Sequence, residues 1–284
     1  MTRHTILITG CTTGGLGYAL AKENHKRGLR VFACSRTLES MEPLAKLGIE
    51  TFVLDVANSQ NIKDLKTTIA EKTGGSLDIL VNSAGLAYPY SVFDLDMARV
   101  RQLYDVNFFG ALEMVHVFLP LLLASNDACV AQISSLAALM PVPFNAVYNS
   151  SKAALLSFGD TLRVEMSPFK VKVITILTGN VQSNIMKPVT LPETSIYQPV
   201  KEIYQKKRID EFQDKAIPAD VFARAVTAEI LKPNPKHHLW IGANWLTVWF
   251  ISMFLPRSTF DFILSRMYGI TELAKRLARG KKAA

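Results

Sequence analysis

The sequence predicts an α/β fold in which a doubly wound, parallel sheet of about seven strands carries helices on both faces. Three observations indicate this fold class. Short apolar runs alternate with amphipathic segments along residues 5–241, a glycine-rich loop follows the first run, and polar sequences directly follow several later runs. Ligands bind at the carboxyl ends of the strands in such sheets. We therefore expect the functional residues at that edge of the sheet.

Seven apolar runs are expected to form the strands, and the segments between them the covering helices. The expected strands are Thr5–Ile8, Arg30–Cys34, Thr51–Leu54, Ile79–Val81, Ala128–Ile133, Lys172–Leu177 and Leu239–Ile241. The expected helices run from the glycine loop to about Arg27, then over Leu38–Leu47, Asn58–Lys72, Met97–Leu119, a segment that contains Tyr148 and Lys152, Lys201–Arg208 and Pro218–Leu231.

The loop between the first strand and the first helix has the sequence TGCTTGGLG, from Thr9 to Gly17. Strand, glycine loop and helix in this order are the layout of a dinucleotide site. Glycine lets the backbone approach a pyrophosphate, and the start of the helix offers N–H groups and the positive end of its dipole. The loop therefore predicts phosphate binding, with a simple turn as the alternative.

The second strand ends in Ser35-Arg36. Binders of NAD carry an acidic residue in this region that holds the ribose 2′-hydroxyl. Here an arginine and a hydroxyl stand instead, and Arg36 suits a 2′-phosphate through charge-assisted hydrogen bonds. We therefore expect NADPH/NADP+ as the cofactor. The alternative reading of Arg36 is a solvated arginine in a loop.

Tyr148 and Lys152 lie four positions apart on an expected helix, so their side chains point the same way. An ammonium beside a phenol lowers the pKa of the phenol, and a tuned phenol can protonate the alkoxide formed by hydride attack on a carbonyl. Ser135, at the end of the fifth expected strand, is placed to donate a hydrogen bond to the same carbonyl oxygen. Asn107 lies in a mainly apolar stretch, where it either ties two backbone segments together or takes part in a proton relay.

Together these motifs resemble the short-chain dehydrogenase/reductase family over about residues 3–243. The resemblance implies that Tyr148 is the acid/base, that Lys152 binds the nicotinamide ribose, that Ser135 orients the carbonyl and that Asn107 holds a relay water. It also implies cofactor contacts from six places along the chain. They are Gly10, Thr13, Gly15, Leu16 and Gly17, then Ser35 and Arg36, Asp55 and Val56, Asn82, Ala84 and Gly85, Tyr148 and Lys152, and finally Val181 and Ser183.

The sequence departs from the usual family pattern at a few positions. The glycine loop is one residue longer than the common TGxxxGxG, and Ser83 stands in place of an asparagine. Thr178 replaces a proline, and Ser183 replaces a threonine that often contacts the carboxamide of the cofactor. None of these departures removes a catalytic group.

More narrowly, the long glycine loop, the CSR sequence after the second strand, the VPFNAVYNSSKAAL region and the apolar tail are similar to the branch with the NADPH-dependent 1-acyldihydroxyacetone-phosphate reductases. The resemblance implies reduction of a lipophilic ketone, with 1-acyldihydroxyacetone phosphate giving 1-acylglycerol 3-phosphate as one candidate reaction. A steroid, retinoid or polyketide ketone is the alternative substrate. A nucleotide-binding scaffold without turnover is the alternative from another functional class.

Composition limits the other functions. The chain has 284 residues, a formal net charge of +8 and 49% hydrophobic residues, but no basic run is interleaved with aromatics, so we expect no nucleic-acid binding. Three scattered cysteines, Cys11, Cys34 and Cys129, favour a reducing compartment over a disulfide framework. No spacing of ligands in the sequence indicates a metal site.

We expect a catalytic domain over residues 1–243, in which residues 184–217 form a substrate lid. The basic triplet Lys206-Lys207-Arg208 in this lid is more typical of a solvated helix face, and contact with a substrate phosphate is the alternative. Residues 244–284 form an apolar and basic extension with all but one of the three tryptophans. Its apolar run is shorter than the roughly 20 residues of a transmembrane helix, so we expect it to dock on a membrane or lipid surface. The alternative is that these apolar helices cover the core or form an interface between copies of the chain. The expected location is the cytoplasmic side of the endoplasmic reticulum membrane or a lipid droplet, and otherwise the cytoplasm.

Overall fold

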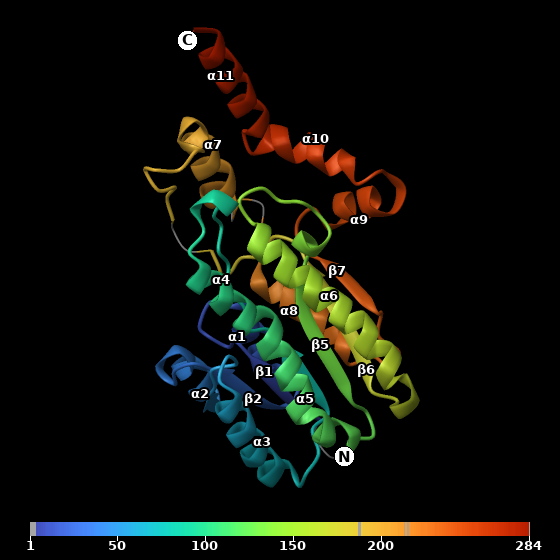
Figure 1. Cartoon of the computed structure of the whole chain (residues 1–284). Coiled ribbons are helices and arrows are strands. Elements are labelled where there is room, and N and C mark those ends of the chain that lie inside the picture. Colours follow the sequence, from blue (N-terminus) through green and yellow to red (C-terminus); the bar gives the residue numbers. More distant parts are fainter. Residues whose placement is uncertain (1–3, 187–188, 213, 215, 284) are drawn as a thin grey trace.

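The computed structural model describes residues 4–186, 189–212, 214 and 216–283. In this part of the chain, seven strands form one sheet in the order β3-β2-β1-β4-β5-β6-β7, and each neighbouring pair is parallel. The chain winds outward from β1 in one direction and then, through β4, in the other, which is the doubly wound arrangement. Figure 1 shows the helices on both sides of this sheet, and the predicted fold class is confirmed.

Every expected strand is present within two residues of its expected bounds. The strands are β1 (Thr5–Thr9), β2 (Arg30–Ser35), β3 (Glu50–Val53), β4 (Ile79–Asn82), β5 (Cys129–Ser135), β6 (Lys172–Thr178) and β7 (His238–Ile241). The central strands are buried on both faces, because helices cover each side. This burial explains why the strands appear in the sequence as continuous apolar runs.

One face of the sheet is covered by α1 (Leu16–Lys26) and α8 (Ala219–Ile230), with the short α2 (Glu42–Ala45) beside them. Ile6 and Ile8 of β1 point to this face and pack with Leu20 of α1 and Phe222 of α8. Leu7, between them, points to the other face and packs there, as the alternation of side chains along a strand requires.

The second face is covered by α3 (Ser59–Thr73), α5 (Gly110–Leu123) and α6 (Ala146–Met166). Ile62, Phe118 and Leu162, one from each helix, pack in the same buried cluster as Leu7. The helix α4 (Met97–Tyr104) precedes α5. These two layers position the carboxyl ends of the strands and the start of α6 at the same end of the molecule (Figure 1).

Three expected helices differ from the observed ones. The segment expected as Leu38–Leu47 is only a 3-10 turn (Glu39–Met41) followed by the single turn α2. The helix expected over Met97–Leu119 is divided into α4 and α5 by a π-helical turn, Asp105–Phe109. Lys201–Arg208 likewise begins as α7 (Lys201–Tyr204) and continues as a second π-helical turn, Gln205–Ile209. Single π turns within helices often occur at functional sites.

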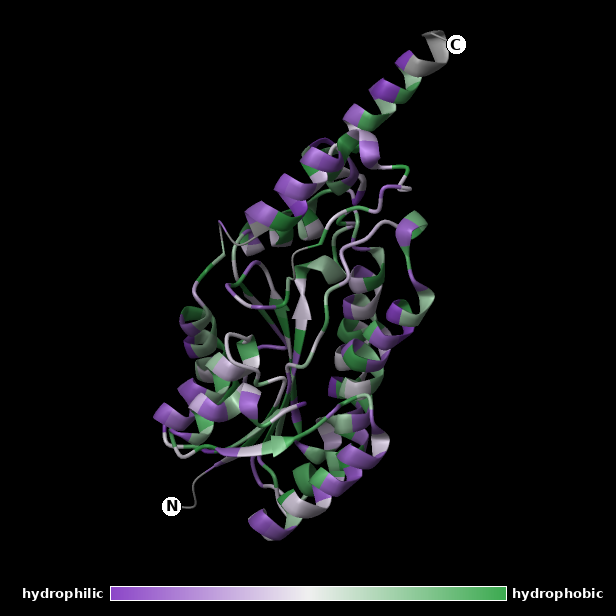
Figure 2. Cartoon of the chain, turned by 90° about the vertical axis from the view of Figure 1, so that its left-hand side faces the viewer, coloured by the Kyte–Doolittle hydropathy of each residue, from purple (hydrophilic) through white to green (hydrophobic). Residues whose placement is uncertain are grey.

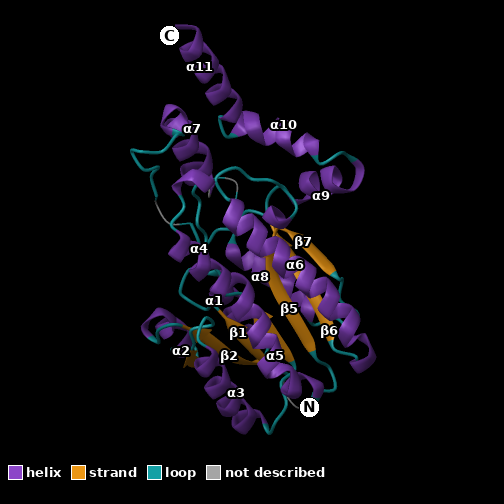
Figure 3. Ribbon diagram, viewed as in Figure 1, coloured by secondary structure: helices purple, strands orange, loops and turns teal. Residues whose placement is uncertain are grey.

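The C-terminal extension forms three helices, α9 (Trp245–Phe254), α10 (Ser258–Met267) and α11 (Ile270–Ala283). They lie with α7 at one end of the molecule, seen as the purple ribbons at the top of Figure 3. Val248 and Ile251 of α9 and Phe260 and Leu264 of α10 pack on the core residues Leu136 and Leu177. The extension therefore covers part of the core with its inner face.

Among the described residues, one helical stretch, Met97–Leu123, is long and apolar enough to cross a membrane by length and composition. This stretch is α4, the π turn and α5, and buried side chains of α5 pack in the core of the second face. We therefore regard it as a core helix. The apolar helix α9 has 10 residues, which is about half the length of a bilayer crossing.

Candidate active site

Ser135, Tyr148 and Lys152 come together where β5 ends and α6 begins. Ser135 is the last residue of β5, and its Oγ accepts a hydrogen bond from the backbone N–H of Ala137 at 3.1 Å. Lys152 is buried, and its Nζ donates to the carbonyl oxygen of Ile133 at 2.8 Å. The same Nζ lies 5.8 Å from the centre of the Tyr148 ring. The structure thus brings the three predicted catalytic groups to one end of the sheet.

The ionisation of these groups differs from the expectation in one respect. Burial raises the pKa of Tyr148 above its ordinary value, while the Ser135 side chain, hydrogen-bonded to it, and the positive charge of Arg208 lower it. Burial also lowers the pKa of Lys152 to about 8. Lys152 was expected to lower the pKa of Tyr148, but its Nζ is turned to the carbonyl of Ile133. Among the described residues, Arg208 is the cation whose charge lowers the pKa of Tyr148.

Asn107 is buried in the π-helical turn between α4 and α5. Its Oδ1 accepts from the backbone N–H of Leu86 at 2.7 Å, and its Nδ2 donates to the Leu86 carbonyl at 3.0 Å. Nδ2 also lies 3.2 Å from Oγ of Ser151, which is on α6. Asn107 therefore connects the chain after β4 to α6, which is the structural role predicted for it as a tie between two segments. A Cβ added at Gly85 would lie 3.5 Å from Asn107 Oδ1 and 3.6 Å from Lys152 Nζ. The side chains of Asn107 and Lys152 therefore both lie close to Gly85.

The glycine loop brings α1 close to the strand ends. Gly10 has a φ of +74°, and a Cβ there would lie 2.7 Å from the Cα of Ala84. A Cβ at Gly17 would lie 2.5 Å from the carbonyl oxygen of Gly10, so only glycine allows this approach of α1 to β1. Gly15 precedes α1 without a side-chain cap, and the first turn contains no acidic residue. The start of α1, with Leu16 as its first residue, is thus suited to an anionic group.

The loop is held in place from both sides by contacts that sequence reasoning did not predict. Ser40 accepts two hydrogen bonds from Thr13 on its carbonyl oxygen, at 2.9 Å from N and 2.8 Å from Oγ1. On the other side, Nδ2 of Asn184 donates to the Thr13 carbonyl at 3.0 Å. Gly14, with a φ of +81°, lies beneath Asn184. Only its positive φ could have been foreseen, because a glycine pair commonly marks such a conformation.

Ser35 and Arg36 lie beside this loop at the end of β2. Oγ of Ser35 is 2.8 Å from Oγ1 of Thr12 and accepts from Oγ of Ser40 at 2.9 Å. Arg36 is exposed. Among the described residues it has no hydrogen-bond or ion-pair partner, so its guanidinium is available to a ligand. Thr12 and Ser40 complete this hydroxyl cluster and were missed because neither has a motif of its own.

The other predicted cofactor contacts line the same edge of the sheet. Oδ1 of Asp55 accepts from the N–H of Ala57 at 3.0 Å, and Val56 beside it is buried. Asn82 is buried and donates to the Ala111 carbonyl at 3.0 Å. The backbone N–H of Ala84 donates to Oγ1 of Thr9, also at 3.0 Å. Val181 and Ser183 follow β6, and Val181 bridges to Ile217. Among the described residues, no cluster of His, Cys, Asp or Glu is arranged to hold a metal ion.

Comparisons with known proteins identify the family of this chain. Residues 4–194 match the family described as short chain dehydrogenase. The chain belongs to this family. It is 39% identical over 283 residues to the short-chain dehydrogenase srdE of Neurospora crassa, covering 98% of this chain and 97% of the relative. It is also 37% identical over 253 residues to an NADPH-dependent 1-acyldihydroxyacetone phosphate reductase of Schizosaccharomyces pombe, covering 84% of this chain and 85% of the relative.

Solved structures confirm the fold of this short-chain dehydrogenase. A short-chain dehydrogenase from Streptomyces avermitilis matches with a TM-score of 0.78 at 20% identity, covering 99% of this chain and 98% of the other. One from Burkholderia cenocepacia, in complex with NADP, matches with a TM-score of 0.72 at 23% identity, covering 92% and 97%. The chain is therefore an oxidoreductase of this family with the expected Rossmann-type fold.

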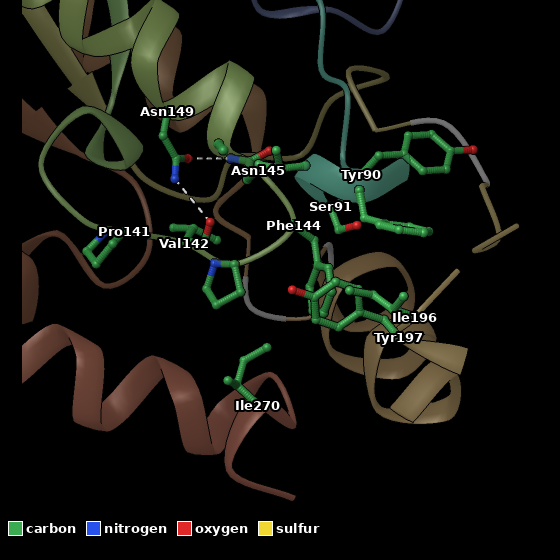
Figure 4. A pocket seen from close by; sticks show the side chains of 14 residues that line it. Tyr90, Ser91, Pro141, Val142, Phe144, Asn145, Asn149, Ile196, Tyr197 and Ile270 are labelled. Carbon is green, nitrogen blue, oxygen red and sulfur yellow. Dashed lines mark hydrogen bonds between the residues drawn. The ribbon is translucent and has the colours of Figure 1, made fainter. Parts of the chain in front are cut away.

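The short-chain dehydrogenase has an apolar groove of about 570 Å³ beside the start of α6. Its walls come from the chain after β4, the chain before α6, the segment after β6 and the first residue of α11. Asn145 and Asn149, which flank Tyr148 in sequence, lie at one side, and Tyr90, Phe144 and Tyr197 at the other (Figure 4). Phe144 packs edge-on to Tyr197, with ring centres 5.0 Å apart.

The described part of the predicted lid packs over this region. Tyr204 is buried, and its hydroxyl donates to the Pro89 carbonyl at 2.7 Å. The basic triplet is divided among three environments: Lys206 is exposed, Lys207 pairs with Glu211 at 2.6 Å, and Arg208 is buried. The triplet therefore does not form a single phosphate clamp. The lid residues 187, 188, 213 and 215 lie outside the described part of the chain.

Proposed function

We propose that this short-chain dehydrogenase is an NADPH-dependent reductase of a lipophilic ketone. The observation that carries the proposal is the convergence of Ser135, Tyr148 and the buried Lys152 at the edge of the sheet where the glycine loop begins α1. A phenol, a hydroxyl and an ammonium held together at that edge match the requirements of carbonyl reduction. A scaffold without turnover has no need of a buried ammonium, because burying a charge is costly.

The residues of the nucleotide edge fit NADPH. Gly10, Gly15 and Gly17 allow a close backbone approach, the uncapped start of α1 suits the pyrophosphate, and the exposed Arg36 suits the 2′-phosphate. The NADPH-dependent relative at 37% identity and a solved NADP complex in the same family at 26% identity, with a TM-score of 0.60, support this choice of cofactor. When bound, NADPH supplies the hydride for the carbonyl carbon.

The protein residues then act on the carbonyl oxygen. Tyr148 is protonated at neutral pH, since its pKa is raised, and so it holds the proton that the new alkoxide needs. Ser135 donates a hydrogen bond to the same oxygen and orients it. Lys152, with a pKa of about 8, remains mostly charged at neutral pH and is available to the nicotinamide ribose. Asn107 holds the chain after β4 against α6 and so keeps this arrangement fixed.

The apolar groove supports a lipophilic substrate. Aromatic and aliphatic side chains line most of it, including Tyr90, Phe93, Phe144, Ile196 and Tyr197, and such surfaces bind acyl chains or fused rings. An acyl-dihydroxyacetone phosphate, reduced to 1-acylglycerol 3-phosphate, is our first candidate because of the relative that carries this activity in its name. Steroid, retinoid or polyketide ketones fit the same groove chemistry and are the second candidates.

A ketone panel tests the proposal. The purified chain would be assayed for NADPH oxidation with acyl-dihydroxyacetone, its phosphate, and unphosphorylated steroid, retinoid and polyketide ketones. We expect turnover with at least one lipophilic ketone and none with short polar ketones. The acyl-dihydroxyacetone phosphate assignment fails if the phosphorylated and unphosphorylated forms react equally poorly while another ketone class reacts well. The reductase proposal fails if NADPH binds but no ketone is reduced.

We further propose that the C-terminal helices dock the enzyme on a membrane or lipid-droplet surface facing the cytoplasm. The outer face of α9 exposes Leu246, Phe250, Met253 and Phe254, each at least half exposed, and α10 exposes Phe262 at 60%. A large apolar patch of this kind on an exposed helix is typical of an interaction surface for a membrane or another protein. Lys275 and Arg279 of α11 are also exposed, and cations near an anionic surface contribute about 1 kcal/mol each. Figure 2 shows the mixture of hydrophilic and hydrophobic residues along the helix that ends at the C-terminus.

Flotation with liposomes tests the docking surface. Vesicles of phosphatidylcholine, with and without phosphatidylserine, would be compared for the parent chain and for a variant with Phe250→Ser, Phe254→Ser and Phe262→Ser. Phe169→Ser is the matched control, since Phe169 is 60% exposed and lies outside the extension. We expect only the triple variant to lose flotation. The docking proposal fails if the parent protein does not float with the vesicles but forms a defined oligomer that the triple substitution dissociates. That result would identify the apolar face as an interface between copies of the chain.

A further inference from the structure

Arg208 is the member of the basic triplet that turns inward. It is 5% exposed, and its Nη2 donates to Oδ1 of Asn145 at 2.6 Å. Tyr204 and Tyr268 lie near enough for their charge states to affect it. A guanidinium is costly to bury, and a neutral side chain would avoid that cost. The choice of a cation at this position therefore calls for an electrostatic explanation.

Asn145 connects this guanidinium to the helix that carries Tyr148. It precedes the first residue of α6, where an asparagine side chain usually caps the free N–H groups of its helix. Here the side chain makes no such cap. Its Oδ1 accepts from Arg208, and its Nδ2 donates to Oδ1 of Asn149 at 2.7 Å. Asn149 in turn donates to the Val142 carbonyl at 3.0 Å. Arg208 is thus fixed to the first turn of α6, the turn that contains Tyr148.

The described residues around Tyr148 include two cations, Lys152 and Arg208, and several phenols. Lys152 lies on the same helix, with its Nζ turned to the Ile133 carbonyl, and Ser135 comes from the end of β5. The cluster that packs with Tyr148 adds the phenol side chains of Tyr88, Tyr90 and Tyr104. Of the charged groups, Arg208 is the one that lowers the pKa of Tyr148, and Tyr148 reciprocally raises the pKa of Arg208. The two groups are therefore mutually coupled.

We propose that Arg208 is a positioning residue that sets the acid strength of Tyr148, a role that the segment after β6 supplies through the Arg208–Asn145 hydrogen bond. This inference rests on the proposed function, because it gives Tyr148 the role of proton donor. The positive charge favours the phenolate over the phenol. Burial alone would leave Tyr148 too weak an acid to give up its proton readily, and Arg208 offsets part of that effect.

The test is the pH dependence of the reverse reaction, alcohol oxidation with NADP+, in the full-length enzyme. This direction requires the phenolate, so kcat/KM rises with pH and levels off above the pKa of Tyr148. Arg208→Gln removes the charge but keeps a hydrogen-bond donor for Asn145, and Arg208→Lys keeps the charge. Lys206→Gln is the matched control, because Lys206 is an exposed cation two positions away. NADPH affinity by fluorescence shows whether each variant remains folded.

We expect the midpoint of the profile to move upward by about one pH unit in Arg208→Gln, by much less in Arg208→Lys, and not at all in Lys206→Gln. A second measurement needs neither substrate nor cofactor. The ultraviolet titration of tyrosinate, compared between the parent and Tyr148→Phe, isolates the signal of Tyr148, and the same subtraction in the Arg208→Gln background should place that signal at higher pH.

Two results would overturn the inference. In the first, Arg208→Gln lowers kcat/KM but leaves both the profile and the tyrosinate signal in place, which would make Arg208 only an anchor. In the second, the loss is confined to the KM of phosphorylated substrates, which would make Arg208 a substrate ligand. A parent enzyme that reduces no ketone contradicts the proposed function instead, and the tyrosinate titration still decides the coupling between Arg208 and Tyr148.

Discussion

Replacing Lys152 with methionine should stabilise the cofactor-free protein at neutral pH. Lys152 is 4% exposed, and burial lowers its pKa from 10.5 to about 8. A shift of about 2.5 units corresponds to roughly 3 kcal/mol of cost for keeping the ammonium charged in the folded state. The variant also loses the charge-assisted hydrogen bond to the Ile133 carbonyl, which costs about 1.5–3 kcal/mol. We therefore expect a net stabilisation of up to about 2 kcal/mol, together with loss of activity.

The sign of the pH dependence follows from the same shift. Below pH 8 the lysine is charged in both the folded and the unfolded chain, so the full cost is present. Between about pH 8 and 10.5 the unfolded chain binds more protons than the folded one, and the stability contributed by this group rises with pH. The advantage of Lys152→Met should therefore shrink across this window. Other groups titrate there too, but the difference between parent and variant removes their effect.

Urea unfolding at several pH values between 7 and 10, without cofactor, measures this difference. Lys206→Met is the matched control, because Lys206 is exposed and its replacement should change the free energy of unfolding by less than about 0.5 kcal/mol. The reasoning would be refuted if Lys152→Met were clearly less stable than the parent at pH 7, or if its advantage were the same at pH 7 and pH 10.

Three further predictions concern the proposed site. Tyr148→Phe should nearly abolish ketone reduction while NADPH affinity by fluorescence stays close to the parent, and retention of most of kcat would contradict the proton-donor role. Arg36→Ala should weaken the binding of NADPH roughly 10- to 150-fold and leave the binding of NADH unchanged, since a charge-assisted hydrogen bond contributes about 1.5–3 kcal/mol. Equal kcat/KM for the two cofactors in the parent enzyme would argue against this role of Arg36. Gly17→Ala should destabilise the fold by about 1–3 kcal/mol in thermal unfolding, because its Cβ would lie 2.5 Å from the Gly10 carbonyl oxygen; a variant as stable as the parent would show that α1 can move away.

The parts of the fold that depend on local pattern could be predicted from the sequence. The strands are continuous apolar runs because both faces of the sheet are covered, and such runs can be recognised in the sequence. The helix expected over Leu38–Leu47 was wrong in extent because Pro43 lies in the first turn of α2 and Gly48 adopts a positive φ. The π turn that holds Asn107 was also missed, since no local propensity marks a widened helical turn.

In the candidate site, too, some features could be predicted from the sequence and others could not. The positions of Ser135, Tyr148 and Lys152 could be predicted because strand end and helix start place them together by topology. The direction of the Lys152 ammonium could not, because its partner, the carbonyl of Ile133, is a backbone group with no sequence signal. Contacts made by Ser40 and Asn184 to the glycine loop were likewise invisible, since each comes from a loop whose path depends on the folded protein.

The helical periodicity of the segment around the basic triplet could have identified Arg208 as the cation that faces the core. Successive residues of a helix point about 100° apart, so three consecutive cations cannot all face one ligand. Tyr204 lies four positions before Arg208, and residues at this spacing share a face. A large aromatic such as Tyr204 is expected to face the core, and the structure buries it at 1% exposure. Arg208 is therefore the cation whose position in sequence already directs it inward, towards the helix that carries Tyr148, while Lys206 is exposed and Lys207 is half-buried and pairs with Glu211.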